Sequence, residues 1–429
     1  MFNGNNMYDL AVELFPLNRS LTGNGVRKTL NILKKFIPEL EIREVECGTK
    51  AFDWTIPEEW SIEAGYIENS KGERIIDFAN NNLHIMGYSA PVDKYVTRQE
   101  LLEYIYVEET RPKAIPYVTS YYKKRFGFCM SMEQRDQLPD DEYHIVIKSN
   151  FIKGSMTYAE VLIPSTQGTD EEIFFSTYIC HPSMANNELS GPCLATALID
   201  YVKGLKKRKY NYRFLFAPET IGSIYYLSIN LERMKKNVKA GYVLSCVGDN
   251  RTFSYVPSRK GDTLADRAAL NVLNHMNNNY IRYSFLDRAS DERQYCSIGV
   301  DLPVCVVCRS KYGCYPEYHT SDDDLSVISA EGLQQTKEVY IQIIDLLEYN
   351  EYYFTNCCCE PQLGKRGLYP TISKKNSYDE VVAMMDLLAY ADGCTDLIGI
   401  SDCINQRAKV LIPIVNRMLQ EGLIVIKNK

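Results

Sequence analysis

Residues 171–208 read EEIFFSTYICHPSMANNELSGPCLATALIDYVKGLKKR, and the fold class can be inferred from them. An apolar run with many aromatic residues ends at His181, and small and polar residues follow it. From about Gly191 the apolar residues recur with the period of a helix. A buried strand, a loop and a helix in this order indicate an α/β domain with the loop at the carboxyl end of the strand.

The alternation of strands and helices extends on both sides of this stretch. Further strand-like runs are EYHIVIK (142–148), TYAEVLIP (157–164), YRFLFAP (212–218), AGYVLSCVG (240–248) and LPVCVVC (302–308). Helical patterns separate the later runs, and a long one at 330–349 closes the series. This order predicts the α/β class, with a largely parallel sheet flanked by helices on both faces. Ligands are expected beyond the carboxyl ends of its strands.

The length of 429 residues exceeds what one hydrophobic core usually supports, so two or three domains are expected. From about residue 54 to 140, short alternating runs and turn signals predict a small β-rich insertion. Its tyrosines and Trp60 are interpreted as packing groups rather than as a platform for a ligand. The predicted domains are an α/β domain at 1–53 and 141–350, the insertion at 54–140, a linker at 351–374 and a C-terminal domain at 375–429.

The C-terminal domain is predicted to contain three short helices and a terminal strand, as in a winged helix-turn-helix. Pro413 lies within the third helical pattern, where it would kink the helix unless the helix begins near Leu411. Residues 361–429 carry nine Lys/Arg and seven Asp/Glu, which is a weak basis for binding nucleic acid. Phosphate contacts could come from Arg407, Lys409 and Arg417. The favoured interpretation is that these three side chains are solvated charges of the helix.

Composition narrows the class of protein further. The net charge of −7 gives no general attraction for nucleic acid or for an anionic membrane. Neither a secretory signal nor an apolar membrane span is recognised, so a cytoplasmic protein is expected. The 14 cysteines lack paired spacing, which favours reduced thiols, and the run at 357–359 lacks the spacers usual in zinc sites.

The chain has five histidines, and two of them occupy distinctive places. His181 directly follows an apolar strand and opens a polar loop. His319 lies shortly before the carboxylates at 322–324. Two histidines that converge at strand ends beside carboxylates are what a zinc site with nitrogen and oxygen ligands requires. Structural, hydrogen-bonded roles are expected for His84, His144 and His275.

The order of segments resembles the bacterial leucyl aminopeptidase and glutamate carboxypeptidase families of co-catalytic zinc peptidases, over about residues 7–50 and 141–348. The motifs that carry the resemblance are LNRSLTGNG (17–25), CHPSMANNELSG (180–191), PETIGS (218–223), SDERQY (290–295) and YHTSDDD (318–324). The resemblance implies that His181 and His319 bind metal and that Glu219 is the general base. It also matches Asp323 to the aspartate that follows the family's His-Thr pair.

Three positions depart from the family pattern. Asn187 stands where a bridging aspartate is expected, Thr220 where a second glutamate is expected, and Ser245 where a further aspartate is expected. Without these carboxylates the repulsion between two cations is poorly offset, so one zinc ion is expected rather than two. The predicted metal ligands are His181, His319 and an oxygen from Asn187, Glu188, Glu219 or Asp249.

The whole pattern also looks like a group of bacterial aminopeptidase-like proteins, often associated with surface-polysaccharide genes. The predicted function is hydrolysis of a peptide or other amide bond, with zinc activating water and Glu219 accepting its proton. The alternative is a degenerate relative that binds a small ligand and contacts DNA or protein through its tail. A homo-oligomer is compatible with either function. The residues expected to bind substrate are Glu188, Asp291, Arg293 and Tyr318.

Overall fold

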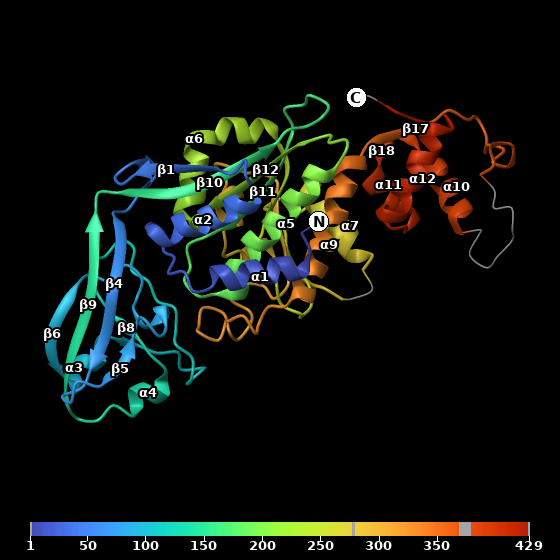
Figure 1. Ribbon diagram of the computed structural model, residues 1–429. Coiled ribbons are helices and arrows are strands. Elements are labelled where there is room, and N and C mark those ends of the chain that lie inside the picture. The colour runs from blue at the N-terminus through green and yellow to red at the C-terminus, as the bar shows by residue number, and fades with distance from the viewer. Residues whose placement is uncertain (1, 277–278, 369–378, 428–429) are drawn as a thin grey trace. The chain divides into compact units, whose positions relative to one another are not determined.

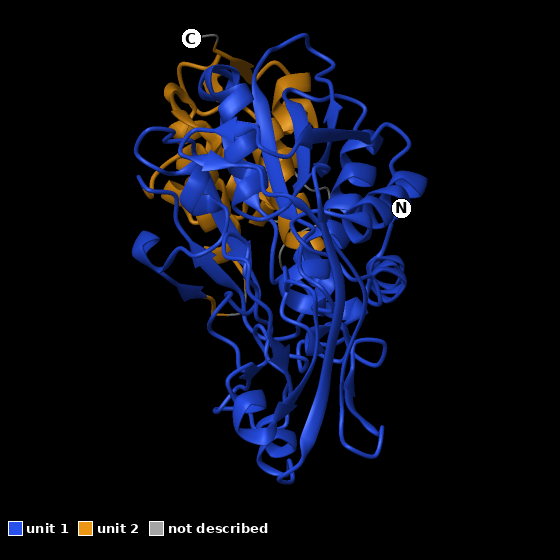
Figure 2. Ribbon diagram, turned by 90° about the vertical axis from the view of Figure 1, so that its left-hand side faces the viewer, with its two compact units in different colours: residues 1–260, 281–336 blue, residues 261–280, 337–429 orange. Residues whose placement is uncertain are grey.

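The computed structural model describes residues 2–276, 279–368 and 379–427. They belong to two compact units, one formed by residues 1–260 and 281–336 and the other by residues 261–280 and 337–429 (Figure 2). No described helix is both long enough and apolar enough to cross a membrane.

A mixed, mostly parallel sheet of eight strands forms the centre of the α/β fold (Figure 1). Its strands, in spatial order, are β1 (Glu41–Glu46), β10 (Ser155–Ile163), β12 (Asn211–Ala217), β11 (Glu172–Tyr178), β13 (Val238–Val243), β16 (Val304–Cys308), β14 (Ser254–Val256) and β15 (Ile281–Arg282). The four strands from β12 to β16 in this order are parallel, and β10 and β14 border them in the antiparallel direction. All residues of β11 and β16 are buried, as expected for strands covered on both faces. The predicted fold class is confirmed.

The helices of this unit bury their apolar faces against the sheet and against one another. In α2 (Asn24–Phe36), Val26, Leu30 and Leu33 recur with helical spacing and are buried. Helix α5 (Ser190–Gly204) packs against β10, β11 and β12, and α1 (Gly4–Leu14) packs against α5. A π-helical turn, η2 (Ala185–Leu189), leads into α5, while α6 (Ile221–Asn237) and α8 (Glu292–Tyr295) pack together.

The inserted segment has its own four-stranded sheet, in the order β5-β4-β9-β6. The long strands β4 (Glu59–Glu68) and β9 (Glu142–Ile152) lie side by side, flanked by β5 (Arg74–Asp77) and β6 (Val92–Thr97) (Figure 1). The sequence-based assignment of 142–148 to the central sheet is therefore wrong. An alternating pattern identifies a strand but not its partner, and Tyr143, Ile145 and Ile147 pack into the insertion's own core.

Shorter elements complete the inserted segment. They are β2 (Lys50–Ala51), β3 (Trp54–Thr55), η1 (Asn82–His84), α3 (Arg98–Leu102), β7 (Ile105–Tyr106), β8 (Phe128–Cys129) and α4 (Met132–Asp136). A further short helix, η3 (Phe285–Asp287), lies between β15 and α8 in the chain.

The second unit contains a winged helix. The elements of the unit are α7 (Leu264–Asn274), the second half of α9 (Ala330–Tyr349), β17 (Tyr352–Thr355), η4 (Gly364–Arg366), α10 (Asp379–Tyr390), β18 (Asp392–Asp396), α11 (Leu397–Ile404), α12 (Ala408–Gln420) and β19 (Ile424–Ile426). The three strands pair in the order β18-β17-β19. The three predicted helices and the terminal strand are present.

The start of the predicted linker is wrong. The linker predicted at 351–374 begins inside the winged helix, because β17 is the central strand of its sheet and Tyr353 is buried. Four residues are too short to show a strand pattern. Of the two alternatives for the third helix, the structure has the one in which Pro413 lies inside it, since α12 begins at Ala408. Residues 369–374 of the predicted linker lie outside the described residues.

Candidate active site

Three loops bring chemically reactive side chains together at the carboxyl ends of parallel strands. His181 follows β11, Glu219 follows β12, and His319 follows β16. The two imidazole centroids are 5.3 Å apart, and His181 Nε2 is 3.6 Å from Glu219 Oε2. The predicted pair of histidines and the predicted general base therefore converge.

A buried carboxylate orients the ring of His181. Glu188 Oε2 is 2.9 Å from His181 Nδ1, and Arg19 donates a hydrogen bond of 2.9 Å from Nε to the backbone carbonyl of His181. Arg19 and Glu188 are completely buried and lie 3.8 Å apart. Because Glu188 engages Nδ1, Nε2 is the nitrogen that faces Glu219. This arrangement is typical of a carboxylate that positions a metal-binding imidazole.

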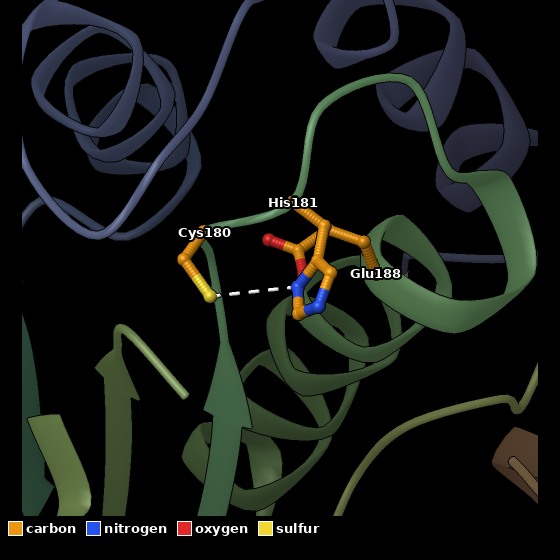
Figure 3. A group of neighbouring side chains, drawn as sticks. All are labelled: Cys180, His181 and Glu188. Atoms are coloured by element: carbon orange, nitrogen blue, oxygen red, sulfur yellow. Dashed lines mark hydrogen bonds and ion pairs between the residues drawn. The ribbon is translucent and has the colours of Figure 1, made fainter. Parts of the chain in front are cut away.

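Cys180, His181 and Glu188 also form a compact group in which one ligand atom from each lies within 4.8 Å of the others (Figure 3). The Cys180 Sγ atom is 3.4 Å from His181 Nδ1. Burial raises the pKa of the Cys180 thiol well above its ordinary value, which opposes formation of a thiolate ligand. The atom of His181 that is left open to a metal is therefore Nε2, and Glu188 supports the ring at Nδ1. Glu188 is fully buried and engaged with His181, so its predicted contact with substrate is not supported.

The pKa values of the two imidazoles are shifted in opposite directions. Burial lowers the pKa of His181, but the charge and hydrogen bond of Glu188 outweigh it, so the pKa lies above its ordinary value. Burial and the charge of His181 hold the pKa of His319 well below its ordinary value. His319 is thus a neutral imidazole, the form that binds metals. Burial raises the pKa of the neighbouring Glu219 carboxyl.

Aromatic rings and a buried carboxylate fix the loop of His319. The ring of Tyr318 stacks on His319 at 3.9 Å between centroids, and Tyr117 contacts it edge-on at 5.1 Å. Asp323 accepts hydrogen bonds from the backbone N–H groups of Asn186 and Asn187, at 2.8 and 3.0 Å. Asp323 therefore joins the loop of one histidine to the loop of the other. Tyr318 thus positions the imidazole, and its contact with substrate stays a prediction.

The residue after Glu219 has a strained backbone. Thr220 has a φ of 64°, which is rare for a β-branched residue. Its N–H donates to Asp291 Oδ1 at 2.8 Å, and Arg293 Nη2 donates to its hydroxyl oxygen at 2.8 Å. Asp291 is buried and also accepts from Ser223, so its predicted contact with substrate is wrong. Burial, followed by the charge of Glu219, raises the pKa of Asp291 to about 7.

Uncharged groups surround the position of the expected bridging carboxylate. Asn187 donates from Nδ2 to the hydroxyl of Tyr178 at 2.9 Å, and Tyr178 also hydrogen-bonds to Ser245. Within the described part of the chain, Asn187 Oδ1 is buried without a hydrogen-bond partner. Asp249, also predicted as a metal ligand, uses both oxygens to accept from Asn186, Ser310 and Arg251. That role of Asp249 is not supported, because these bonds hold neighbouring loops together.

The histidines and Glu219 open onto a cavity of about 360 Å³. Its lining comes from the α/β part and from the inserted segment: Leu21, Trp54, Tyr117, Thr119, Tyr121, Tyr122, Cys180, His181, Glu219, Thr220, Ile221, Arg293 and His319. The inserted segment is attached to the His319 loop, since the backbone N–H of Tyr117 donates to the carbonyl of His319 at 2.8 Å. The aromatic wall of this cavity consists of Trp54, Tyr117, Tyr121 and Tyr122, so these side chains are not packing groups alone. The sequence YVTSYY at 117–122 held the signal, an aromatic cluster on a short polar loop.

Comparison with known proteins places this geometry in a family. Residues 8–350 match a family described as a domain of unknown function, DUF4910. The chain belongs to the DUF4910 family. Residues 351–426 match a winged helix-turn-helix family, which agrees with the fold of the tail.

Relatives of this DUF4910 chain include a Clostridium acetobutylicum protein that is 46% identical over 400 residues, covering 93% of this chain and 91% of the relative. It is provisionally named a polysaccharide biosynthesis protein with an aminopeptidase-like domain. A crystal structure of a provisionally named peptidase from Clostridium acetobutylicum superposes with a TM-score of 0.92 at 43% identity, covering 99% of this chain and 96% of the other. The resemblance to aminopeptidase-like proteins with a winged helix is confirmed.

The fold of the DUF4910 chain also matches that of a zinc aminopeptidase from Bacillus subtilis. The TM-score is 0.61 at 12% identity, over 80% of this chain and 95% of the enzyme. This likeness shows the fold. The described residues of the site offer ligand atoms that fit zinc, the metal expected from the sequence. His319 Nε2 and Asn187 Oδ1 are buried atoms without hydrogen-bond partners in the described chain. The separation of 3.6 Å between His181 Nε2 and Glu219 Oε2 places a carboxylate oxygen beside the ring nitrogen that is open to a metal.

Proposed function

We propose that this protein is a hydrolase that uses one zinc ion to cleave an amide bond in a peptide or other small molecule. The observation that carries the proposal is the convergence of His181, Glu219 and His319 on the wall of one cavity. Two imidazoles supply metal ligands, and a carboxylate beside them supplies a proton acceptor. These are the groups that hydrolysis of an amide requires.

His181, His319 and one oxygen would hold the zinc. Among the described oxygens considered as ligands from the sequence, Asn187 Oδ1 and Glu188 Oε1 lack a hydrogen-bond partner. Glu188 is paired with Arg19 and His181, which leaves Asn187 Oδ1 as the open oxygen ligand and Glu219 for proton transfer. When bound, zinc supplies Lewis-acid chemistry that polarises a carbonyl group. The uncharged contacts among Asn187, Tyr178 and Ser245 support a single ion, since a second cation would lack an anionic ligand there.

Glu219 accepts a proton from the attacking water and delivers it to the departing amine. Its carboxyl lines the cavity and lies beside His181. Burial raises its pKa, which brings the group closer to the range in which it can both take up and release a proton near neutral pH. Asp291 is a second carboxyl with a raised pKa, and it accepts a hydrogen bond from the N–H of Thr220. It therefore supports the loop of Glu219.

Zinc titration combined with an amidase assay tests the proposal. We expect about one zinc per chain, lost in His181→Ala and His319→Ala and retained in the control His144→Gln. Glu219→Gln should abolish release of amine from short peptides and N-acyl amino acids while keeping zinc and fold. Zinc retention by both alanine variants, or undiminished turnover in Glu219→Gln, would contradict the proposal.

The second candidate is a ligand-binding protein without catalysis. It is favoured by the absence of carboxylates at Asn187, Thr220 and Ser245, three positions where the zinc-peptidase resemblance implies them. With this function, ligand binding would change how the winged helix contacts DNA or protein. Saturable ligand binding by the zinc-loaded protein without any turnover would select this candidate.

A further inference from the structure

The lining of the cavity beside His181 combines two kinds of group. It contains the two imidazoles and Glu219, and it also contains Arg293 and aromatic residues of the inserted segment. The imidazoles and Glu219 are accounted for by metal binding and proton transfer. Arg293 and the aromatic wall are not, so they are the groups that can select a ligand.

Arg293 carries a positive charge that no described carboxylate neutralises within ion-pair distance. Among the described residues, its guanidinium makes one hydrogen bond, from Nη2 to Thr220 Oγ1 at 2.8 Å. A guanidinium has five N–H donors, so most of them remain available. The bond to Thr220 holds the group at the cavity, and Thr220 is itself fixed by Asp291. A guanidinium held in this way presents a fork that matches the two oxygens of a carboxylate.

The aromatic wall offers a flat apolar surface. Trp54 and Tyr122 meet edge to face at 5.7 Å between ring centroids, and both line the cavity. Their exposed fractions of 37% and 55% are large for aromatic residues in contact with each other. Exposed aromatic surface that surrounds a cavity with a few polar groups is typical of a binding site for a small molecule.

We propose that the ligand of this cavity is a small amide that carries a carboxylate group and a planar apolar group. Arg293 binds the carboxylate, and Trp54 and Tyr122 contact the planar group, which leaves the amide near Glu219 and the histidines. The cleavage of this amide rests on the function proposed above, whereas its binding does not. The cavity of about 360 Å³ is within the range of roughly 300–1,000 Å³ found for small-molecule sites.

The fluorescence of Trp54 provides a direct readout of binding. The chain has two tryptophans, and Trp60 is 4% exposed, so a ligand in the cavity should quench Trp54 alone. The probes are N-benzoylglycine and N-benzoylglycinamide, which share the ring and the amide but differ in the carboxylate. We expect N-benzoylglycine to bind at least about tenfold more tightly than N-benzoylglycinamide, which is the ratio given by one charged hydrogen bond. A Trp54→Phe variant should lose the quenching.

Three variants and a metal chelator test whether Arg293 causes the preference for the carboxylate probe. Arg293→Gln should bring the two dissociation constants together, Arg293→Lys should keep part of the difference, and the exposed control Arg288→Gln should keep all of it. Equal binding of both probes by wild type, or no saturable quenching by either, would overturn the proposal. So would a preference that survives Arg293→Gln but disappears with chelator, because the metal would then hold the carboxylate. Binding without turnover would leave this inference standing and contradict hydrolysis instead.

Discussion

Glu188 lies between the guanidinium of Arg19 and the imidazole of His181. All three side chains are buried, and Glu188 is the carboxylate paired with both groups. The sequence indicated that Glu188 belongs to the loop after His181 but not where its side chain points. The π-helical turn, in which the N–H of Leu189 donates to the carbonyl of Met184, changes that direction in a way that spacing alone does not reveal.

Replacing this carboxylate should affect both stability and metal binding. Glu188→Gln leaves the buried Arg19 without a compensating charge, so the free energy of unfolding should fall by about 3 kcal/mol. The loss of the carboxylate at His181 Nδ1 should weaken zinc binding by about 10- to 100-fold. Urea unfolding and calorimetric zinc titration measure the two effects. The exposed Glu109→Gln serves as control, and wild-type zinc affinity in Glu188→Gln would remove Glu188 from the metal site.

Asn187 offers a complementary substitution at the same site. Asn187→Asp would place a carboxylate in a buried, uncharged environment beside Tyr178, so the metal-free protein should be less stable than wild type. Zinc should restore the lost stability, because an anion beside a cation is stabilised. The zinc-induced rise in Tm of Asn187→Asp should therefore exceed that of wild type. Thermal unfolding with and without zinc measures the difference. An equal zinc-induced shift in both proteins would mean that residue 187 does not face the metal.

At the scale of elements, what the sequence predicts well is the part of the fold with strong periodic patterns. The strands at β10–β13 and β16 and the helix at α5 follow from continuous apolar runs and helical spacing. The strand β18 was missed because its sequence, DGCTD, contains residues that are poor in strands, and pairing with β17 outweighs that preference. At the site, strand ends identified His181 and His319, and the resemblance to zinc peptidases added Glu219. The sequence YVTSYY at 117–122 marks an aromatic cluster, but its contact with these loops depends on tertiary structure and could not be inferred.

The first turn of α5 depends on a close approach that only glycine allows. A Cβ on Gly191 would lie 2.3 Å from both the carbonyl oxygen of Leu244 and the hydroxyl oxygen of Thr177. Gly191→Ala should therefore displace α5 from the sheet and lower the free energy of unfolding by about 1–3 kcal/mol. Gly204→Ala, near the end of the same helix, meets no atom within 4 Å and should be neutral or slightly stabilising. Equal stabilities of the two variants in urea unfolding would contradict this account.

At the scale of the whole molecule, α11 of the winged helix is tied to α7, although more than a hundred residues separate the two helices in the chain. Arg267 in α7 binds Asp396 at the start of α11, with a distance of 2.8 Å from Nη1 to Oδ2. Asn271 in α7 donates to Ser401 at 2.9 Å. Within this unit Arg417, considered for contact with phosphates, lies 3.4 Å from Glu380. The charge of Arg417 is thus partly offset, and nucleic acid remains a predicted partner only.

The contact between Asp396 and Arg267 should make the stability of the winged helix depend on pH. Burial raises the pKa of Asp396, but hydrogen bonds from Arg267, Gly399 and Asn350 outweigh it, so the pKa lies below its ordinary value. The stabilisation is therefore present above the unfolded-state pKa of about 3.9 and is lost as pH falls through the lower folded-state value. Asp396→Asn should weaken the unit at pH 7 by about 2 kcal/mol, the scale of a hydrogen bond to a charged group.

Hydrogen exchange of residues 379–426, followed by mass spectrometry, measures this effect in the full chain. At pH 7 the amides of α11 should exchange faster in Asp396→Asn than in wild type, because Asn keeps the cap of the helix but not the charge that holds Arg267. The difference should shrink in samples pre-equilibrated at progressively lower pH below about 3.9, where the wild-type carboxyl also becomes neutral. Exchange in the metal-site loop at 181–189 serves as internal control and should not change. A difference between variant and wild type that is independent of pH would show that Asp396 stabilises the unit through its hydrogen bonds alone, without a contribution from its charge.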